Sequence, residues 1–233
     1  MPVKKKASIR RRLFIWCLKF LLVLWVCTLC QVFLLRFANP PFTATTLWRW
    51  IRSGNFVKDH RLYNSWKTLD EISPHLRKAV LAGEDQRFLS HHGFDFTEMN
   101  MAIRDILFKK QIRGASTITM QTARTVFLWP HRDLFRKTAE AYYTVLIELF
   151  WNKERILEIY INTVDWGNNL MGAERASKKY FHTSASGLSR YQAALLVAIL
   201  PNPHEWTPVR PGRQVLTRQK KILKDMKKMP LIG

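Results

Sequence analysis

A long apolar stretch near the N-terminus constrains the fold of this chain more than any other feature of its sequence. Residues 13–35 read LFIWCLKFLLVLWVCTLCQVFLL, with Lys19 as the only charge. An α-helix of about two dozen apolar residues can cross a bilayer, and Lys19 lies near enough to the basic end to extend its ammonium group to the interface. A cleaved signal peptide has a shorter apolar region and an A-x-A-like cleavage site, and no such site follows here. We therefore predict a transmembrane helix over residues 13–35 rather than a buried core helix.

The charge of the chain indicates where the rest of it lies and what it meets. The segment before the span, MPVKKKASIRRR, is strongly basic, and such segments stay in the cytoplasm. We therefore expect residues 1–12 in the cytoplasm and the remaining chain on the outer side of the membrane. A net charge of +21 on 233 residues implies an anionic partner such as nucleic acid, a phosphate-bearing substrate or an anionic membrane surface. The membrane anchor favours the last two, and we expect no nucleic-acid partner.

The region beyond the span is predicted to be mainly α-helical. Residues 36–72 contain the turn NPPFT and the aromatic, basic stretch WRWIRSG, which suit a connector near the membrane surface. Residues 73–233 form the expected globular domain. No stretch shows sustained strand alternation, and capping residues and helical apolar spacing predict helices over residues 73–82, 95–109, 116–127, 133–150, 152–161, 171–181 and 189–200, and in the basic tail RQVLTRQKKILKDMKKM.

The sequence gives no pattern for a cysteine-based metal site or a histidine zinc site in this domain. All three cysteines, Cys17, Cys27 and Cys30, fall within the predicted span. The domain therefore has no cysteine with which to build a disulfide framework or a thiolate metal site. Histidine spacing gives no HExxH or similar zinc pattern either.

Two adjacent acids stand out in the stretch GEDQRFLSHHG, residues 83–93. Glu84 and Asp85 follow an apolar helix directly. A carboxylate at the end of such a helix can have a raised pKa and act as a general base or acid. The more common alternative is a solvated helix end or an ion pair.

Two further stretches carry groups suited to an anionic ligand. In RGASTITMQTARTVFL, Ser116 and Thr117 are expected at a helix N-terminus, where free N–H groups favour an anion, with Gln121 and Arg124 about one and two turns further on. An ordinary capped amphipathic helix is the alternative.

In RKTAEAYYTVLIE, Arg136 and Glu140 are four residues apart and share a helix face. This pattern fits a simple surface ion pair. It also fits a cation for phosphate beside a second carboxylate.

These stretches, followed by KERILEIYINTVDWGNNLMGAERASKKYF and LSRYQAALLVAILPNPHEWTP, resemble in their order the peptidoglycan glycosyltransferase family, which polymerises lipid II. The resemblance covers about residues 62–208. The first motif, E-D-x-x-F-x-x-H-x-G, is matched by Glu84, Asp85, Phe88, His91 and Gly93. The second, G-[GA]-S-T-I-[ST]-Q-Q-x-x-K-N, is matched by Gly114, Ala115, Ser116, Thr117, Ile118, Thr119 and Gln121. The third, R-K-x-x-E, is matched by Arg136, Lys137 and Glu140. The single anchor and short chain resemble the monofunctional, biosynthetic members.

The resemblance implies a mainly α, lysozyme-like glycosyltransferase domain anchored to the bacterial inner membrane, with its catalytic domain on the periplasmic side. Lipid II is then joined into β-1,4-linked glycan strands, with inversion and release of polyprenyl diphosphate. Glu84 is implied as the general base and Glu140 as the second catalytic carboxylate. The implied substrate-binding residues are Asp85, Phe88, His91, Ser116, Thr117, Gln121, Arg124, Arg136 and Lys137.

The expected partners are lipid II, the growing glycan chain, membrane lipids and other cell-wall synthesis proteins. The resemblance leaves open whether a divalent cation, Mg²⁺ or Mn²⁺, binds at the diphosphate. Several positions depart from the family pattern, which puts the detail of donor-site binding in doubt: Met120 for glutamine, Arg124 for lysine, Thr125 for asparagine, Asn169 for glycine and Gln192 for glutamate.

Two other functions remain as alternatives at this point. A lysozyme-like hydrolase or lytic enzyme uses similar carboxylates but needs neither an anchor nor cations for a diphosphate. A non-catalytic basic membrane protein would explain the charge but not the five ordered motifs. A transpeptidase is not expected, because no S-x-x-K or K-T-G signature is present.

Overall fold

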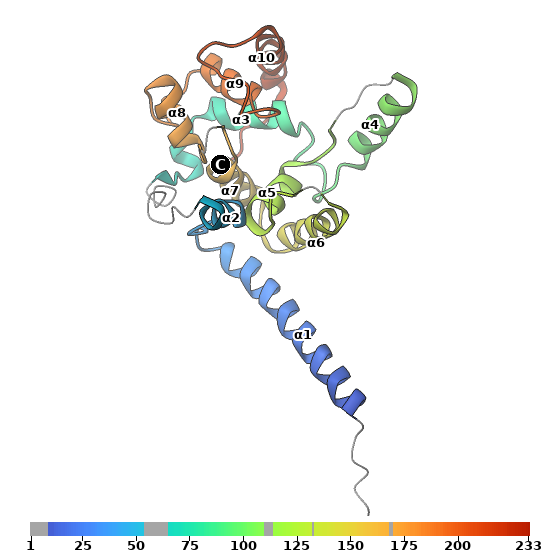
Figure 1. Cartoon of the computed structure of the whole chain (residues 1–233). Helices are drawn as coiled ribbons and strands as arrows, with labels where there is room; N and C mark the ends of the chain where they lie inside the picture. The colour runs from blue at the N-terminus through green and yellow to red at the C-terminus, as the bar shows by residue number, and fades with distance from the viewer. Residues whose placement is uncertain (1–8, 54–64, 110–113, 132, 168–169) are drawn as a thin grey trace, which may run out of the picture. The chain divides into compact units, whose positions relative to one another are not determined.

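The computed structural model describes residues 9–53, 65–109, 114–131, 133–167 and 170–233, and its regular elements over these residues are helices (Figure 1). The helices are α1 (Ile9–Leu35), α2 (Ala44–Ser53), η2 (Leu69–Glu71), α3 (Pro74–Glu84), α4 (Phe96–Lys109), α5 (Ile118–Phe127), α6 (Leu134–Phe150), α7 (Lys153–Thr163), α8 (Ala173–Phe181), α9 (Arg190–Ala198), α10 (Arg213–Asp225) and η3 (Met226–Lys228). No strand occurs in the described residues, where an isolated bridge pairs Asp165 with Met171. The mainly α class is confirmed.

The chain divides into two compact units, Met1–Asn39 and Pro40–Gly233. The first contains α1, whose residues Arg10–Leu35 are long and apolar enough to cross a membrane, and the most apolar part of this segment is not buried by the protein. This helix includes the predicted span. The predicted cytoplasmic segment lies mostly outside the described residues, because the description begins at residue 9.

Capping residues set the starts of most helices in the second unit. Ser73 accepts a hydrogen bond from the His75 amide and Pro74 takes the first position of α3, where a proline is favoured. Asp133, Asn152 and Ser189 cap α6, α7 and α9 in the same way. These starts agree with the sequence prediction, and α3 runs to Glu84, two residues beyond the expected end.

Two helix starts were predicted one residue too early, those of α5 and α8. The cap of α8 is Gly172, whereas the sequence predicted a start at Met171. The cap of α5 is Thr117, whose hydroxyl accepts from the Met120 amide at 3.2 Å. Ser116 therefore lies one residue before the cap. Both residues are good caps, so the local sequence alone does not choose between them.

The expected connector contains a helix that packs on the second unit. Its helix α2 packs against α5, and the Thr45 hydroxyl donates to the Thr125 carbonyl at 3.2 Å. Arg49 of α2 also forms an ion pair with Asp165. Residues 54–64 of this region lie outside the described residues.

The core of the second unit has two groups of helices. One group packs α3 with α9 and α10, and the other packs α5 with α6 and α7. Their contacts are made by fully buried side chains such as Leu76, Ile118, Ile147, Leu157 and Leu196. Burying each such side chain contributes about 1.5–3 kcal/mol. This packing fixes the C-terminus of α3 and the N-terminus of α5, where the first two motifs lie.

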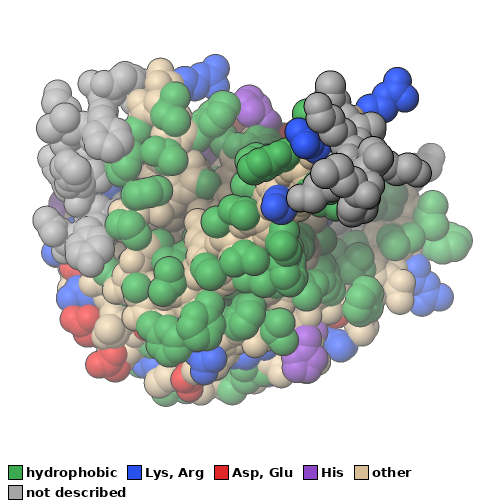
Figure 2. Space-filling model, turned by 90° about the horizontal axis from the view of Figure 1, so that it is seen from below, with side chains coloured by type: hydrophobic (Ala, Val, Ile, Leu, Met, Phe, Trp, Pro, Cys, Tyr) green, Lys and Arg blue, Asp and Glu red, His purple; other side chains and the backbone are tan. Residues whose placement is uncertain are grey.

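The surface carries an extensive apolar area. Figure 2 shows hydrophobic side chains gathered on one face, with basic and histidine side chains beside them. In Figure 1, α4 stands out from the other helices of this unit. At the end of α4, Ile106, Leu107 and Phe108 are exposed, whereas Leu128, which follows α5, is buried in the core. Exposed large apolar residues outside α1 include Phe42, Ile51, Phe96, Ile103, Leu134, Phe135 and Leu149.

Candidate active site

The candidate base, Glu84, is the last residue of α3 and is held by groups from two other helices. Gln121 of α5 donates from Nε2 to Glu84 Oε2 at 3.0 Å. Arg218 of α10 donates from Nη2 to Glu84 Oε1 at 2.8 Å. The Glu84 side chain is only 12% exposed. Both carboxylate oxygens are therefore oriented by donors, and each keeps a second lone pair for another proton.

The environment of Glu84 raises its pKa above the ordinary value. Burial is the largest cause, because it disfavours the charged form. The charge of Arg218, the hydrogen bond from Gln121 and the charge of Arg124 act in the opposite direction. A buried carboxylate with a raised pKa is a stronger base than an exposed one once it is ionised.

Gln121 is itself oriented by a buried tyrosine. Tyr160 of α7 donates its hydroxyl to Gln121 Oε1 at 3.2 Å and is 2% exposed. The pKa of Tyr160 lies well above its usual value because of burial first and the negative charge of Glu84 second. Tyr160 therefore stays protonated and remains a hydrogen-bond donor. This donation turns the Gln121 amide so that its NH₂ group faces Glu84.

Arg124 contributes positive charge to this site, and its guanidinium is not engaged by another of the described side chains. It lies on the same helix as Gln121, its side chain is partly exposed, and its charge lowers the pKa of Glu84. Its guanidinium has no hydrogen-bonded or ion-paired partner among the described residues. Its guanidinium is therefore available to an anion that approaches Glu84.

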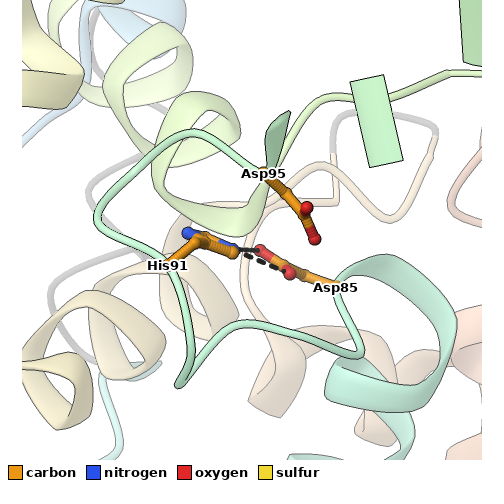
Figure 3. Close-up of side chains that lie close together, drawn as sticks. All are labelled: Asp85, His91 and Asp95. Atoms are coloured by element: carbon orange, nitrogen blue, oxygen red, sulfur yellow. Dashed lines mark hydrogen bonds and ion pairs between the residues drawn. The ribbon is translucent and has the colours of Figure 1, made fainter. Parts of the chain in front are cut away.

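Asp85 connects the first motif to the start of α5. Its two oxygens each lie 3.0 Å from His91 Nε2, and Oδ2 accepts from the Ile118 amide at 3.0 Å. Figure 3 shows the His91 ring directed at the Asp85 carboxylate, with Asp95 beside them. A carboxylate at a helix N-terminus is favoured by the helix dipole. Asp85 thus fixes the loop after Glu84 onto α5.

Asp85, His91 and Asp95 lie close enough together to resemble a cation site. One ligand atom from each of Asp85, His91 and Asp95 lies within 4.8 Å of the others. The Asp85 oxygens, however, already accept from a ring nitrogen and a backbone amide, and Asp95 pairs with Arg87 at 3.2 Å. The cluster is a hydrogen-bonded Asp85–His91 pair with a neighbouring Arg87–Asp95 ion pair, in which His91 Nδ1 has no hydrogen-bond partner among the described residues. With the ligand atoms engaged in this way, it does not fit a metal ion.

The N-terminus of α5 differs from the expectation that it offers free N–H groups to an anion. Asp85 accepts from the Ile118 amide, and the Thr117 hydroxyl accepts from the Met120 amide. Thr117 also donates to the Gly93 carbonyl at 2.6 Å. These backbone donors are therefore occupied by the protein. Thr117 has a structural contact, and Ser116 remains partly exposed beside it.

Phe88 is buried beneath the first motif next to an ion pair. The Lys153 ammonium lies 4.5 Å from the centre of the Phe88 ring and donates to the His91 carbonyl at 2.7 Å and to Glu148 at 2.8 Å. Glu148 also accepts from Thr119 of α5 at 2.6 Å. This group joins the first motif to α5, α6 and α7. Phe88 therefore supports the site from the core side.

A second cluster on α6 contains the other predicted carboxylate. Glu140 is fully buried, and it accepts from Arg136 Nη1 at 2.5 Å and from Lys137 Nζ at 2.6 Å. Lys137 remains 47% exposed on its side chain. Each Glu140 oxygen is bound to a cation, and the positive charges of Arg136 and Lys137 oppose the approach of a divalent metal to this carboxylate. The residues present do not fit a metal held by Glu140.

The loop of the first motif packs against α6, near Glu140, at Gly93. Thr144, one turn after Glu140, donates to the Glu140 carbonyl at 2.7 Å. A Cβ added at Gly93 would lie 2.7 Å from the Thr144 methyl group, and the backbone of Gly93 has a φ of +86°. Only glycine fits both the space and the backbone conformation. The glycine of the first motif therefore sets how closely its loop approaches α6.

The sequence analysis named none of Arg218, Tyr160 and Lys153 as a site residue. Arg218 lies beyond the stretch covered by the resemblance. A signal for it does exist: it is three residues after Val215 and four before Ile222, which are both buried. A charged residue on the apolar stripe of a helix needs a partner inside the protein.

The departures from the family pattern lie in different places. Met120 is buried. Gln192 accepts from the Ser189 amide at 2.9 Å as part of the cap of α9, so it has a structural role. Asn169 lies outside the described residues.

Comparisons with known proteins agree on one family. Residues 53–227 match the family model described as Transglycosylase. The chain is similar to the biosynthetic peptidoglycan transglycosylase of Bdellovibrio bacteriovorus, at 46% identity over 89% of this chain and 83% of the relative. It is also similar to proteins of the same description from Caulobacter vibrioides, at 43% identity over 92% and 91%, and Bacteroides thetaiotaomicron, at 40% identity over 99% and 90%.

Proposed function

This chain belongs to the transglycosylase family and is a peptidoglycan glycosyltransferase, and from that premise we propose how its residues polymerise lipid II. Its mainly helical, lysozyme-like fold carries the site at the end of α3. Its substrates are lipid II and the growing glycan chain. The observation that carries the proposal is the largely buried Glu84 carboxylate, which has a raised pKa and is oriented by Gln121 and Arg218.

Glu84 is the general base of the transfer. It takes the proton from the 4-hydroxyl of the acceptor sugar as that oxygen attacks the anomeric carbon of the donor. The new bond is a β-1,4 linkage, and the bond between the anomeric carbon and the diphosphate oxygen breaks with inversion. The leaving polyprenyl diphosphate takes the bonding electrons. Asp85 and His91 fix the loop that follows the base, and Phe88, Ser116 and Thr117 complete its surroundings.

The donor diphosphate is held by side-chain cations. Negative charge accumulates on this leaving group in the transition state, so cations placed there stabilise the transition state more than the ground state. Arg124 has its charge available beside Glu84, and Lys137 is partly exposed beside Arg136. Gln121 adds a neutral hydrogen-bonding group. The role of Glu140 is to hold Arg136 and Lys137 in place, which needs no divalent metal.

The cation set favours transfer over hydrolysis. A glycan hydrolase has no diphosphate to bind, whereas Arg124 here has no partner within the described part of the protein. Arg136 and Glu140 are buried, and burying two charges costs desolvation energy that an exposed ion pair does not incur. The pair is therefore not a simple surface ion pair.

The N-terminal helix anchors the enzyme where its substrate lies. We propose a single pass through the bacterial inner membrane, with residues 1–12 in the cytoplasm, residues 13–35 in the bilayer, residues 36–72 near the membrane surface and the glycosyltransferase domain of residues 73–233 on the periplasmic side. The exposed apolar side chains of α2, α4 and α6 suit contact with membrane lipids. Other cell-wall synthesis proteins are proposed partners.

The test is polymerisation of labelled lipid II by the purified full chain, beside Glu84→Gln. Gln keeps the size of Glu but cannot accept the proton, so we expect strands from the wild type and a loss of at least about 100-fold in the variant. Lipid II binding should persist in Glu84→Gln. An active Glu84→Gln variant would refute the assignment of the base. Cleavage of preformed glycan without polymerisation would instead support the hydrolytic alternative.

A further inference from the structure

Arg218 reaches the active site from the last long helix of the described chain. Its helix, α10 (Arg213–Asp225), packs against α3 and α9, and most of its other cations face solvent. The Arg218 side chain is 30% exposed. Arg218 therefore lies on the side of α10 that faces α3, whereas the other cations of α10 lie on its exposed side.

One nitrogen of Arg218 makes two contacts at the end of α3. Nη2 donates to the Gly83 carbonyl at 2.8 Å and to Glu84 Oε1 at 2.8 Å. The last carbonyls of a helix have no partner within the helix, and a cation there is also favoured by the helix dipole. Arg218 therefore binds both the end of α3 and the side chain proposed as the base.

The approach of α10 to this point depends on Gly83. A Cβ added at Gly83 would lie 2.6 Å from a methyl group of Val197 and 3.2 Å from Ile222 Cδ1. The close crossing of α3 with α9 and α10 thus requires a residue without a side chain. This packing fixes Arg218 within hydrogen-bonding distance of Glu84.

We propose that Arg218 is a positioning residue that keeps the Glu84 carboxylate ionised and aimed for proton transfer, an inference that rests on the proposed role of Glu84. It acts through Glu84 and not by contact with the reacting sugars. Its hydrogen bond fixes one carboxylate oxygen while Gln121 fixes the other. The proton of the acceptor hydroxyl then has a charged, correctly oriented acceptor.

The other charged groups around Glu84 cannot replace Arg218 in this role. From α5, Arg124 contributes positive charge, but the proposed function assigns that charge to the donor diphosphate. From α7, Tyr160 stays protonated and neutral, and from α9 the apolar Val197 packs at Gly83, the residue before Glu84. Asp85, next in sequence, is paired with His91. Arg218 is therefore the cation that stays with Glu84 when a donor occupies the site.

The sign of the effect follows from the pKa of Glu84. Burial raises this pKa and Arg218 lowers it. Removing the Arg218 charge therefore raises the pKa of Glu84 further, and a smaller fraction of the enzyme holds the ionised base at neutral pH. The acidic limb of the profile of kcat/KM against pH should move to higher pH, and activity should recover at alkaline pH.

The experiment measures lipid II polymerisation by the full chain from about pH 5 to 9, in detergent, for the wild type and three variants. Arg218→Gln removes the charge, Arg218→Lys keeps it, and Lys220→Gln removes an exposed charge from the same helix. We expect Arg218→Gln to move the acidic limb up by about one pH unit, which is about a tenfold loss on that limb. Arg218→Lys should keep the limb near its wild-type position, and Lys220→Gln should match the wild type.

Three results would overturn the proposal. They are an Arg218→Gln variant with wild-type activity, one that loses the same fraction at every pH, and an Arg218→Lys variant whose limb shifts as far as that of Gln. Thermal unfolding of each variant at each pH separates a shifted limb from a loss of folded protein. Failure of the proposed base is distinguishable, since Glu84→Gln would then remain active whatever Arg218 does.

Discussion

The Tyr160 hydroxyl donates a hydrogen bond to Gln121 Oε1 at 3.2 Å, and through this bond a fully enclosed residue of α7 controls an amide that faces the proposed base. Gln121 has an oxygen and an NH₂ group that are similar in shape. The tyrosine selects which of them points at Glu84. A contact of the core thereby sets the polarity of the active site.

We expect Tyr160→Phe to lower kcat/KM for lipid II polymerisation by about 3–10-fold. The net contribution of one such hydrogen bond is about 0.5–1.5 kcal/mol, and the benzene ring preserves the packing. Tyr191→Phe, which changes an exposed tyrosine, is the matched control and should have no effect. Unchanged kinetics in Tyr160→Phe would show that Gln121 keeps its orientation without the tyrosine.

Arg124 should be replaceable by lysine but not by glutamine. We expect Arg124→Gln to reduce kcat/KM by at least about 100-fold, because the two charge-assisted contacts it would lose to a diphosphate are worth about 1.5–3 kcal/mol each in proteins. Arg124→Lys should lose less than about tenfold, because the point charge remains although the bidentate geometry is lost.

Steady-state kinetics at two salt concentrations would test this assignment. The wild type and Arg124→Lys should weaken as salt rises, and Arg124→Gln should respond less, because one screened cation has been removed. Equal losses for Lys and Gln would argue against a charge role for Arg124.

The Lys153–Glu148 pair should matter for stability more than for chemistry. Both side chains are largely buried, at 20% and 8% exposure. Removing one partner of such a pair typically costs about 3–5 kcal/mol, because the other charge is left unpaired. For a domain of this size each kcal/mol corresponds to about 2–4 °C in Tm. We therefore expect Lys153→Met to melt at least about 6 °C below the wild type.

An exposed lysine provides the comparison for that measurement. Lys179→Met removes a charge from the surface of α8 and should leave Tm nearly unchanged. The double variant Lys153→Met with Glu148→Gln should recover part of the loss, because no buried charge then remains unpaired. A double variant that is less stable than the sum of its single changes would contradict this account.

The raised pKa of Glu84 predicts a stability difference that depends on pH. In the folded protein the pKa lies above the unfolded value of about 4.3, with burial as the leading cause. The protonated form is thus favoured by folding, and the wild type loses stability as pH rises through the folded pKa. Glu84→Gln resembles the protonated form at every pH.

We therefore expect Glu84→Gln to match the wild type in Tm near pH 4 and to exceed it increasingly as pH rises to the folded pKa of Glu84, above which the difference stays constant. Each unit by which the pKa is raised is equivalent to about 1.4 kcal/mol. Differential scanning calorimetry of both proteins from pH 4 to pH 7 measures the difference. A constant or shrinking difference across this range would contradict the raised pKa.

Features that depend on a few neighbouring residues could be predicted from the sequence. The starts of α3 and α6 were correct because Ser73 and Asp133 offer a side-chain acceptor to amides two and three residues away. The start of α5 was displaced because Ser116 and Thr117 are equally capable caps. The choice between them is made by Gly93, 24 residues earlier, whose carbonyl binds the Thr117 hydroxyl.

Features that depend on distant parts of the chain could not be predicted in this way. The resemblance placed Glu84 at the centre of the site, but Arg218 approaches it from 134 residues further along the chain. The expectation of free amides at the start of α5 failed because Asp85, which is 33 residues from Ile118, occupies one of them. Such contacts arise only when separate helices pack, and no local pattern specifies them.

The distribution of the site over α3, α5, α7 and α10 has a consequence for the order in which the site is completed during protein synthesis. Because Arg218 lies 134 residues after Glu84, a growing chain contains the proposed base long before the cation that positions it. During that interval the carboxylate has neither its ion pair nor α10 beside it. The environment of the proposed base is thus completed late in synthesis, when α10 packs against α3.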